Sequence, residues 1–543
     1  MFKIQMRLAF LLTSLILFLL SCRKHETQSS GSLTLSTNAI SLDTTVNTQT
    51  TFTVQSTVSW TTSQVPDWLK LDVTSGVSGN TVVSVIAGSN NGTANARTAN
   101  ITFSPTGNSD IQPVTLTVTQ RPYTFTLGFR KALGGQNFDG ATYKIAMSPD
   151  GGTVIAGGTY SNDGDVHGNH GGADLWVIKL NAAGDTLWTK TYGGTLNDGA
   201  SSIVATPDGG YAIIGSTESN DGDVHGNHGN GDLWLLKLNA AGDTVWTKTY
   251  GGSGNEGSGE IVTTSDGGYA ISGYTTSTNI DIHDNHGSAD MFLMKLTANG
   301  TLIWSKTYGG SDWEEPRSLI TTSEGGFVLA GLTESNDKDV TGFHVPIFVG
   351  FDTWIVKVDG NGNKIWAHAY GGTFDDVAIT IAATVGGYII TGYTNSNDGD
   401  ITGYHGRASP IFYDMLVMKL DDNGKKLWVH AYGGTFDEFG LSVISTTDGG
   451  YVVAGGASSK NGDVSGYNGN GGELDMWIIK LDNSGNKQWG KTIGGSGDEN
   501  WFSIEAIPGG FILTGLTDGK DGDMAGAGSH GDYDIWIGKL FVK

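Results

Sequence analysis

The sequence is poor in cysteine, proline and basic residues, and each scarcity narrows what the protein can be. Cys22 is the only cysteine among 543 residues, and proline occurs 10 times, so no intramolecular disulfide can stabilise the fold. Lysine and arginine total 31 against 55 aspartates and glutamates, for a formal charge of −24. Because this charge repels phosphates, we expect no nucleic-acid partner and regard cations as the more plausible charged ligands.

Glycine and aromatic residues are abundant instead. The chain has 84 glycines and is 10% aromatic, a composition typical of many short strands joined by tight turns. A length of 543 residues exceeds one ordinary core, so two or more domains are expected. The composition therefore predicts an all-β protein with several domains.

The N-terminal segment has the pattern of a secretory signal peptide. Lys3 and Arg7 precede the apolar run LAFLLTSLILFLL, which ends at Leu20-Ser21-Cys22. The sequence LLSC resembles a bacterial lipobox, and this resemblance implies cleavage after residue 21 and lipid attachment to the sulfur of Cys22. The alternative is an ordinary signal peptide with a chance cysteine. No later apolar run approaches the roughly 20 residues of a membrane span.

We therefore expect a lipid-anchored protein of the cell envelope, on an outer membrane. Residues 22–30 are expected to form a polar tether. They lack an acidic run that resembles a surface-export tag, so the membrane face, periplasmic or external, stays open.

Residues 31–121 are predicted to form a separate β-sandwich. Runs such as TTFTVQSTVSW and QPVTLTVTQ alternate between apolar and polar residues and are bounded by turn residues. The order of Trp60, the stretch PDWLKL (66–71), SGVSGNTVV, the segment beginning at Arg97 and the closing VTLTVTQ resembles the BACON domain of Bacteroidetes secreted proteins. That resemblance implies either carbohydrate binding or a spacer that holds a partner module off the membrane. For Trp60 and Trp68 we favour core packing over a sugar-binding role.

The rest of the chain consists of seven copies of one unit. Each copy has an Asp two residues before a large apolar residue, and a Lys five residues after that Asp. Successive Asp positions differ by 58, 58, 62, 62, 61 and 59 residues, which indicates repeated supersecondary units. The aspartates are Asp174, Asp232, Asp290, Asp352, Asp414, Asp475 and Asp534.

Each copy is predicted to form four antiparallel strands, lettered a to d outward from a central axis. In the second copy they are SSIVAT, YAIIGST, DLWLLKL and TVWTKTY. Four strands per copy with apolar residues on both faces predict a seven-bladed β-propeller over residues 122–543. The DGG turn, the DxWxxKL strand and the WxKxYGG strand resemble a bacterial β-propeller repeat family, over residues 125–543.

The two ends of the repeat region predict how the ring closes. The segment FTLGFRKALGG (125–135) aligns with the fourth-strand pattern, whereas the last copy stops after its third strand. The N-terminal strand should therefore complete the last blade and remove an open sheet edge. The fourth-strand tryptophans, with Phe129 in place of the seventh, are expected to pack between blades: Trp188, Trp246, Trp304, Trp366, Trp428 and Trp489.

The alternating strand direction assigns two sets of loops to one rim. The b-to-c loops and the d-to-a loops should lie together on what we call the loop rim. A pair of glycines follows each fourth strand, and an acidic residue stands five residues after the first glycine of each pair. We expect these seven acids to surround the mouth of the channel on an acidic face. They are Asp139, Asp198, Glu256, Glu314, Asp376, Glu438 and Glu499.

The b-to-c loops carry Asp-x-Asp pairs followed by a further Asp, an arrangement that calcium favours because it supplies hard oxygen ligands on a bending backbone. The candidate calcium ligands are Asp163, Asp165, Asp174, Asp221, Asp223, Asp232, Asp398, Asp400 and Asp414. Two copies have Asn279 or Asn461 at the first position. The alternative is that these side chains hold the loops by accepting backbone N–H bonds. H-x-x-H pairs such as His167 and His170 raise a weaker prediction of a transition-metal site.

Specificity is expected where the copies disagree. The loops of copies four and five lengthen into TGFHVPIFVGFD (341–352) and TGYHGRASPIFYD (402–414), and two tryptophans stand near the start of a first strand. Aromatic faces beside polar groups suit sugar rings, although the same side chains could fill gaps between loops. The candidate ligand-binding residues are Trp313, Phe343, Phe348, Phe351, Tyr404, Arg407, Phe412, Tyr413 and Trp501.

These patterns favour a lipid-anchored binding protein that recognises glycan without catalysis. One alternative is a protein-interaction scaffold in an envelope complex. Another is a polysaccharide-cleaving enzyme, for which paired acids such as Asp375 and Asp376 would be candidates. Such pairs are local versions of a pattern found in every copy, so no asymmetric catalytic pair is marked out.

Overall fold

The computed structural model describes residues 31–42, 49–88, 96–107, 110–345, 350–406, 411–469 and 472–543, apart from the side chains of residues 141–143. The signal peptide (1–21), Cys22 and the tether (22–30) lie outside the described residues. The chain divides between Pro122 and Tyr123 into two compact units. Within the described part, no helix is long and apolar enough to cross a membrane.

The first unit is a β-sandwich of two sheets. Their strand orders are β1-β3-β7-β5 and β2-β9-β8-β4-β6. The strands are β1 (Leu33–Leu35), β2 (Ala39–Leu42), β3 (Gln49–Ser56), β4 (Trp60–Thr62), β5 (Leu69–Leu71), β6 (Ser75–Gly76), β7 (Gly79–Ala87), β8 (Arg97–Pro105) and β9 (Val114–Gln120).

Aromatic side chains fill the core of the sandwich. Trp60 is 1% exposed, and its ring lies 5.4 Å from that of Phe103, which in turn meets Phe52 edge-on at 5.6 Å. Trp68 is partly buried against the same core, and the Arg97 guanidinium lies 4.5 Å from the centre of its ring. The predicted core role of Trp60 is therefore confirmed.

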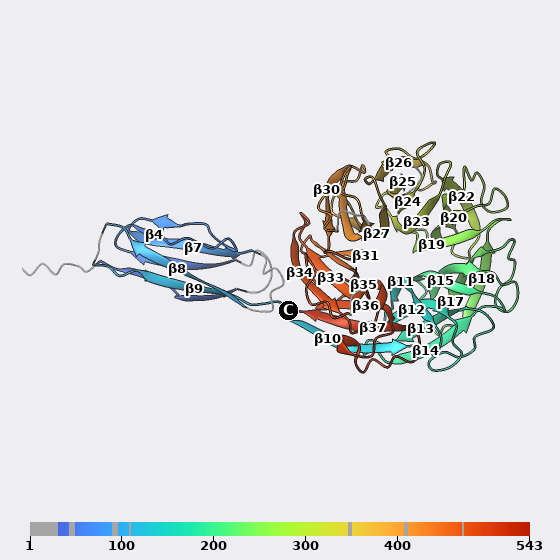
Figure 1. The fold of residues 1–543 in the computed structure, drawn as a ribbon, viewed down its shortest axis with the longest axis horizontal. Coiled ribbons are helices and arrows are strands. Elements are labelled where there is room, and N and C mark those ends of the chain that lie inside the picture. Colours follow the sequence, from blue (N-terminus) through green and yellow to red (C-terminus); the bar gives the residue numbers. More distant parts are fainter. Residues whose placement is uncertain are drawn as a thin grey trace, which may run out of the picture. The chain divides into compact units, whose positions relative to one another are not determined.

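The second unit is a propeller of seven four-stranded antiparallel blades (Figure 1). Blades one to three comprise β11 (Asp139–Met147), β12 (Thr153–Thr159), β13 (Asp174–Leu180), β14 (Thr186–Tyr192); β15 (Asp198–Ala205), β16 (Tyr211–Thr217), β17 (Asp232–Leu238), β18 (Thr244–Tyr250); and β19 (Glu256–Thr263), β20 (Tyr269–Thr275), β21 (Asp290–Leu296), β22 (Leu302–Tyr308). Blades four to six comprise β23 (Glu314–Thr321), β24 (Phe327–Thr333), β25 (Asp352–Val358), β26 (Lys364–Tyr370); β27 (Asp376–Thr384), β28 (Gly387–Thr394), β29 (Asp414–Leu420), β30 (Lys426–Tyr432); and β31 (Glu438–Ser445), β32 (Tyr451–Ala457), β33 (Asp475–Leu481), β34 (Lys487–Ile493).

Blade seven joins the two ends of the propeller. It consists of β35 (Glu499–Ile507), β36 (Gly510–Thr517), β37 (Asp534–Val542) and β10 (Phe125–Leu133), with the short 3-10 helix η1 (Gly522–Met524) between β36 and β37. β10 pairs antiparallel with β37, from Phe125 opposite Val542 to Leu133 opposite Ile535. The predicted closure by the N-terminal strand is confirmed, and β37 is paired on both sides, with β36 and with β10.

The repeated aromatic residues explain why the blades stack. Third strands such as β17 are buried along their whole length, because both sheet faces are covered by neighbouring blades. Trp188 of blade one meets Tyr211 of blade two at 6.5 Å, and Trp246 meets Tyr269 of blade three at 6.4 Å. The predicted packing role of the fourth-strand tryptophans is confirmed.

Candidate functional site

The d-to-a and b-to-c loops lie together on the loop rim, as their alternating directions predict. The backbone N–H of Gln136 donates to Asp163 Oδ1 at 2.9 Å, which joins the two loop types within blade one. The N–H of Asp198 donates to the carbonyl of Ala173 at 2.6 Å, which joins blade two to blade one. The loop rim therefore ties neighbouring blades together and surrounds one end of the channel.

The first Asp of each Asp-x-Asp pair holds a d-to-a loop. Asp221 accepts the backbone N–H of Thr195 at 2.8 Å and its hydroxyl at 2.9 Å. These hydrogen bonds lower the pKa of Asp221. Asn279 performs the same task in blade three, accepting the N–H of Ser253 at 3.0 Å. Asn fits this position because the loop requires an acceptor and not a charge.

The second Asp of the pair and the Asp that begins the third strand make different contacts. Asp223 accepts the N–H of Gly193 at 3.2 Å. Asp232, which begins β17, is buried and accepts the N–H of His228 at 2.8 Å as well as bonding to its ring at 2.9 Å. Asp165, Asp174, Asp398, Asp400 and Asp414 likewise have hydrogen-bond or ion-pair partners within the rim. Among the described residues, no group of three or more His, Cys, Asp or Glu is arranged to hold a metal ion.

The seven acids that begin the first strands differ from our expectation. We expected them on an acidic face around the channel mouth, but each is buried, with an exposed fraction between 0 and 3%. Asp198, for example, accepts the N–H of Gly194 at 2.7 Å and the hydroxyl of Ser219 at 2.8 Å. The expectation was wrong because the glycine-rich loops fold over these carboxylates and supply their hydrogen-bond donors.

Each of these acids forms a buried pair with the Asp of a third strand. Asp290 and Glu314 both face Gly309, as Asp232 and Glu256 face Gly251. In all seven pairs the third-strand Asp has a buried Oδ1 without a hydrogen-bond partner among the described residues. Burial, with the neighbouring carboxylate adding to it, raises the pKa of Asp376 and Glu438 to about 7 and that of Glu499 to about 8.

The predicted ligand-binding aromatics gather over blades three to six. Trp313 lies 5.0 Å from Tyr274 and, with Phe351 and Tyr393, packs against the buried cluster of Leu332, Val377 and Ile379. Tyr413 lies 5.0 Å from Tyr393, and its hydroxyl donates to Asp375 Oδ2 at 2.9 Å.

The remaining predicted residues are more scattered. Phe412 meets Phe436 edge-on at 5.3 Å, and the hydroxyl of Tyr404 donates to the carbonyl of Phe412 at 2.8 Å. Phe343 is partly exposed in the loop of blade four. Phe348 and Arg407 lie outside the described residues. The structure therefore brings Trp313, Phe351 and Tyr413 into one region. Phe343 makes none of the contacts described for these three.

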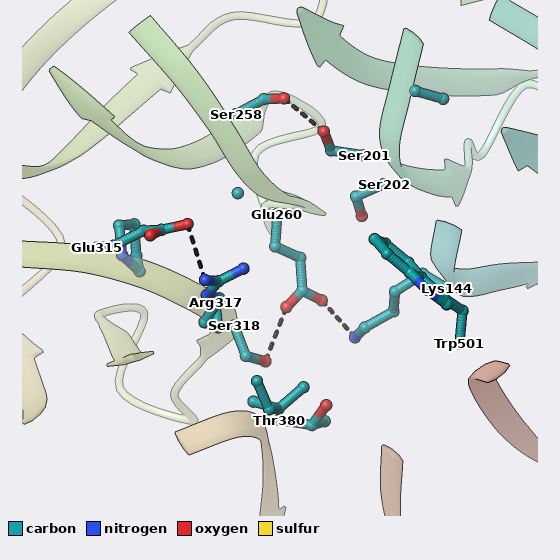
Figure 2. Close-up of a pocket in the computed structure, with 14 residues that line it drawn as sticks. Lys144, Ser201, Ser202, Ser258, Glu260, Glu315, Arg317, Ser318, Thr380 and Trp501 are labelled. Atoms are coloured by element: carbon teal, nitrogen blue, oxygen red, sulfur yellow. Dashed lines mark hydrogen bonds and ion pairs between the residues drawn. The ribbon is translucent and has the colours of Figure 1, made fainter. Parts of the chain in front are cut away.

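A cavity of about 220 Å³ lies between the parts of the innermost strands that are next to the loop rim. Figure 2 shows the residues that line it. Several residues that line the cavity stand at β-bulges, where each innermost strand departs from regular pairing with its neighbour. The pairing skips Ser201 in β15, Arg317 in β23 and Ile379 in β27, and an equivalent bulge in β35 contains Trp501. Bulges redirect side chains, and all four of these residues line the cavity.

Two ion pairs line the cavity, one between two innermost strands and one within β23 (Figure 2). Lys144 pairs with Glu260, which is 3% exposed and also accepts the Ser318 hydroxyl and the Leu319 N–H, both at 2.8 Å. Burial alone would lower the pKa of Lys144, but the attraction of Glu260 and Glu505 outweighs it and raises the pKa. Arg317 Nη2 lies 3.3 Å from Glu315 Oε1.

A second cavity of about 430 Å³ continues the channel away from the loop rim. It is lined by the later parts of the innermost strands, including Ile203, Ile261 and Glu505. Lys144 and Glu260 line both cavities. The Lys144–Glu260 ion pair therefore lies where the two cavities meet.

Sequence reasoning identified Trp501 but missed the cavity. Lys144, Glu260 and Arg317 belong to three different blades and do not recur between copies. The signal that could have found Glu260 and Arg317 is the variation at the third and fourth residues after each first-strand acid, as in Ser201-Ser202, Gly259-Glu260 and Arg317-Ser318, whereas Lys144 stands fifth after Asp139. Those positions vary because they face the channel rather than another blade.

The strand arrangement defines a β-propeller. No family model matches the chain. Over 258 residues the chain is 22% identical to regulatory protein FlaEY of Caulobacter vibrioides, an alignment that covers 45% of this chain and 26% of FlaEY. The chain therefore spans about a quarter of the length of that relative.

Solved structures similar to the chain include propellers with low sequence identity. Puromycin hydrolase is 12% identical with a TM-score of 0.40, over 70% of this chain and 50% of that one. Sqt1 from Chaetomium thermophilum is 10% identical with a TM-score of 0.37, over 77% of this chain and 100% of that one. The Neurospora crassa Pan2 WD40 domain is 10% identical with a TM-score of 0.32, over 58% of this chain and 86% of that one. These similarities concern the fold alone.

Proposed function

We propose that the protein is a lipid-anchored, cell-envelope binding protein that recognises glycan at the loop rim without cleaving it. The observation that carries this proposal is Trp501, a tryptophan that is 45% exposed and lines a cavity rich in polar groups. Sugar rings bind where an aromatic face meets their C–H surface and polar side chains bond to their hydroxyls. The channel mouth offers both kinds of group.

The asymmetry of the loop rim supports the same proposal. The blades repeat one backbone plan, yet the aromatic residues Trp313, Phe351 and Tyr413 accumulate on blades four and five. Asp375 stands among them, bonded to the Tyr413 hydroxyl at 2.9 Å and to the Phe351 N–H at 3.3 Å. A chain of several sugars could extend from the channel mouth across this region.

A binding role is favoured over catalysis because the rim carboxylates serve the fold. Asp376, for example, accepts the Gly372 N–H at 2.7 Å and the Ser396 hydroxyl at 2.8 Å, the same contacts as its counterparts in other blades. Glycoside cleavage requires one pair of carboxyl groups set apart at a defined separation. Glu260, the buried acid of the cavity, is already held by Lys144, Ser318 and Leu319.

A glycan array probed with residues 23–543, in calcium and again in chelator, tests the proposal. We expect saccharide binding that falls on Trp501→Ala, Trp313→Ala or Tyr413→Ala while the melting temperature shows that each variant is folded. A blank array under both conditions would refute glycan recognition.

The anchoring part of the proposal rests on the lipobox-like LLSC, and the spacer role rests on the BACON-like first unit, which implies a Bacteroidetes source. Labelling of growing cells with an alkyne fatty acid should tag the wild-type protein and not Cys22→Ser. An unlabelled wild-type protein that is secreted intact would contradict lipidation. Protease treatment of whole cells would then distinguish the periplasmic from the external face.

A protein-interaction scaffold is the second candidate function, and exposed apolar side chains on the d-to-a loops favour it. Phe138, Leu196, Phe374 and Phe436 are 36 to 52% exposed in equivalent loops. Apolar side chains that gather in one exposed patch mark protein contacts, and these four stand on the same rim in two pairs of adjacent blades. Replacing all four by Ser should abolish cross-linking to envelope proteins if this function holds, and should leave glycan binding intact.

A further inference from the structure

One hydroxyl group of the channel cavity has no hydrogen-bond partner in the described part of the chain, although the equivalent groups of two other blades have one. The fourth residue after the first-strand acid is Ser202 in blade two, Ser318 in blade four and Thr380 in blade five. Ser318 donates to Glu260, and Thr380 donates to the carbonyl of Leu441 at 2.6 Å. The hydroxyl of Ser202 is buried, at 1% exposure for the residue, and has no hydrogen-bond partner among the described residues.

A buried hydroxyl without a partner is unfavourable, and native proteins usually satisfy such a group with protein, water or ligand. Ser202 lines the cavity together with Ser201, Ser258 and Lys144 (Figure 2). The Ser201 and Ser258 hydroxyls bond to each other at 2.5 Å, so together they have one further proton to donate. The Ser201 and Ser258 hydroxyls are therefore open to a polar guest, and a change of the Ser202 rotamer would bring its hydroxyl to the guest as well.

The charges of the cavity favour an uncharged guest. Among the residues that line this cavity, Lys144 pairs with Glu260 and Arg317 with Glu315, so two cations are matched by two carboxylates. A charged ligand would leave one of these groups unbalanced in a partly buried site. Planar Arg and Glu side chains instead offer donors and acceptors that adjacent hydroxyls can use together.

Trp501 supplies an apolar wall that the backbone holds in an unusual conformation. Its φ is 58°, in the left-handed region that residues other than glycine rarely adopt, and it stands at the bulge of β35. Non-glycine residues in that region concentrate at ligand sites, where strain is tolerated because the geometry serves binding. The indole is both exposed and part of the cavity lining.

The size of the cavity limits the guest. Its volume of about 220 Å³ is enough for one sugar ring. The Lys144–Glu260 ion pair stands where it meets the second cavity, so a longer guest would extend from that ring towards the loop rim. We propose that this cavity is a subsite for a single neutral sugar residue at the end of a glycan, held by Trp501, Ser202 and the Arg317–Glu315 pair.

This proposal rests on the proposed glycan recognition and adds the place and chemical class of the terminal residue. Saturation-transfer NMR with residues 23–543 tests it, using methyl glycosides of neutral hexoses, 6-deoxyhexoses and pentoses, and a methyl uronide as the charged comparison. Two variants alter the cavity: Trp501→Ala removes its apolar wall and Ser201→Phe fills it. Tyr160→Ala is the matched control, because Tyr160 is an aromatic residue of the loop rim, 52% exposed, that is neither among the residues that line the cavity nor among the predicted ligand-binding residues.

We expect at least one neutral glycoside to receive saturation, with a signal at least fivefold lower in both cavity variants and unchanged in Tyr160→Ala. Melting curves must show that the variants are folded. A stronger signal from the uronide, or a signal that persists in both cavity variants, would overturn the proposal.

The glycan array separates this proposal from the proposed function. If the array is positive while no methyl glycoside receives saturation, glycan recognition stands and the cavity proposal fails. If the array and the glycosides are both blank, both fail.

Discussion

Asp290 and Glu314 lie on either side of Gly309 so closely that no side chain fits between them. A Cβ added at Gly309 would stand 2.6 Å from Asp290 Oδ1 and 2.6 Å from Glu314 Oε2. The same relationship recurs around Gly251, where both distances are 2.5 Å. The glycine that follows the fourth-strand tyrosine is therefore required by two buried carboxylates from neighbouring blades.

Gly309→Ala should destabilise the propeller, because the new methyl group must push apart two carboxylates that the loop rim holds in place. Overpacking of this kind costs roughly 1–3 kcal/mol. Gly199→Ala is the control, since a Cβ there meets nothing within 4 Å. Urea unfolding should show a lower midpoint for Gly309→Ala and an unchanged or higher one for Gly199→Ala. Equal midpoints would contradict the carboxylate packing.

The stability of the propeller should fall as the pH rises from about 5 to 8.5. Burial raises the pKa of Asp376 and Glu438 to about 7 and of Glu499 to about 8, above the values of 3.8 and 4.5 for the unfolded side chains. The folded state therefore retains protons that the unfolded state has lost. Each group loses roughly 1.4 kcal/mol of stabilisation per pH step between its two pKa values. The pKa of His405, raised by its bond to Asp414, acts in the same direction.

Calorimetry at pH 5.5 and 8.5 checks this pH dependence. Glu438→Gln should reduce the difference between the two melting temperatures, because the amide cannot titrate. Asp208→Asn is the control. Hydrogen bonds from Thr206 and Lys237 lower the pKa of Asp208 to about 2, so its contribution is lost only as the pH falls below about 4. A wild-type melting temperature that rises between pH 5.5 and 8.5 would contradict the buried acid pairs.

Lys419→Met should stabilise the protein. Lys480 of blade six bonds to Asp448 at 2.9 Å, but blade five has a shorter turn without this Asp, and Lys419 Nζ is buried with no hydrogen-bond partner in the described structure. Burial lowers the pKa of Lys419. Replacing a buried, unpaired ammonium by an apolar side chain of similar length should raise stability by about 1 kcal/mol or more.

Lys480→Met is the matched comparison for Lys419→Met. It leaves Asp448 without its cation, so we expect a neutral or lower urea midpoint. A lower urea midpoint for Lys419→Met than for Lys480→Met would mean that the Lys419 ammonium has a hydrogen-bond partner in solution.

Asp221→Asn distinguishes loop-holding from calcium binding, the cofactor that the Asp-x-Asp pattern predicts. Asn279 already performs the equivalent task, with Nδ2 donating to the Ser253 hydroxyl at 3.1 Å. We therefore expect Asp221→Asn to keep the wild-type melting temperature and Asp221→Ala to lower it. A rise in the wild-type melting temperature with millimolar calcium, lost in Asp221→Asn, would instead assign a metal to this loop.

The sequence predicted the fold because the blades are built from residues that recur. The spacing of the third-strand Asp residues defined seven copies, and the mismatch between the two ends predicted the pairing of β10 with β37. The sequence predicted which residues begin the first strands but not that these acids are buried, since the burial of Asp198 depends on how the glycine loops fold over it. The cavity escaped prediction because Lys144, Glu260 and Arg317 meet only through the closed ring.

The bulges of the innermost strands hold residues that evolve under different constraints from the residues that build the blades. Ser201, Arg317, Ile379 and Leu441 occupy one position in blades two, four, five and six, yet they comprise a hydroxyl, a guanidinium and two aliphatic side chains. Because the sheet ladder skips them, they are free of the requirements that fix the glycines, tyrosines and acids of the rim. Mutation can therefore vary these positions one blade at a time, so the lineage can acquire new ligands while inheriting the same ring.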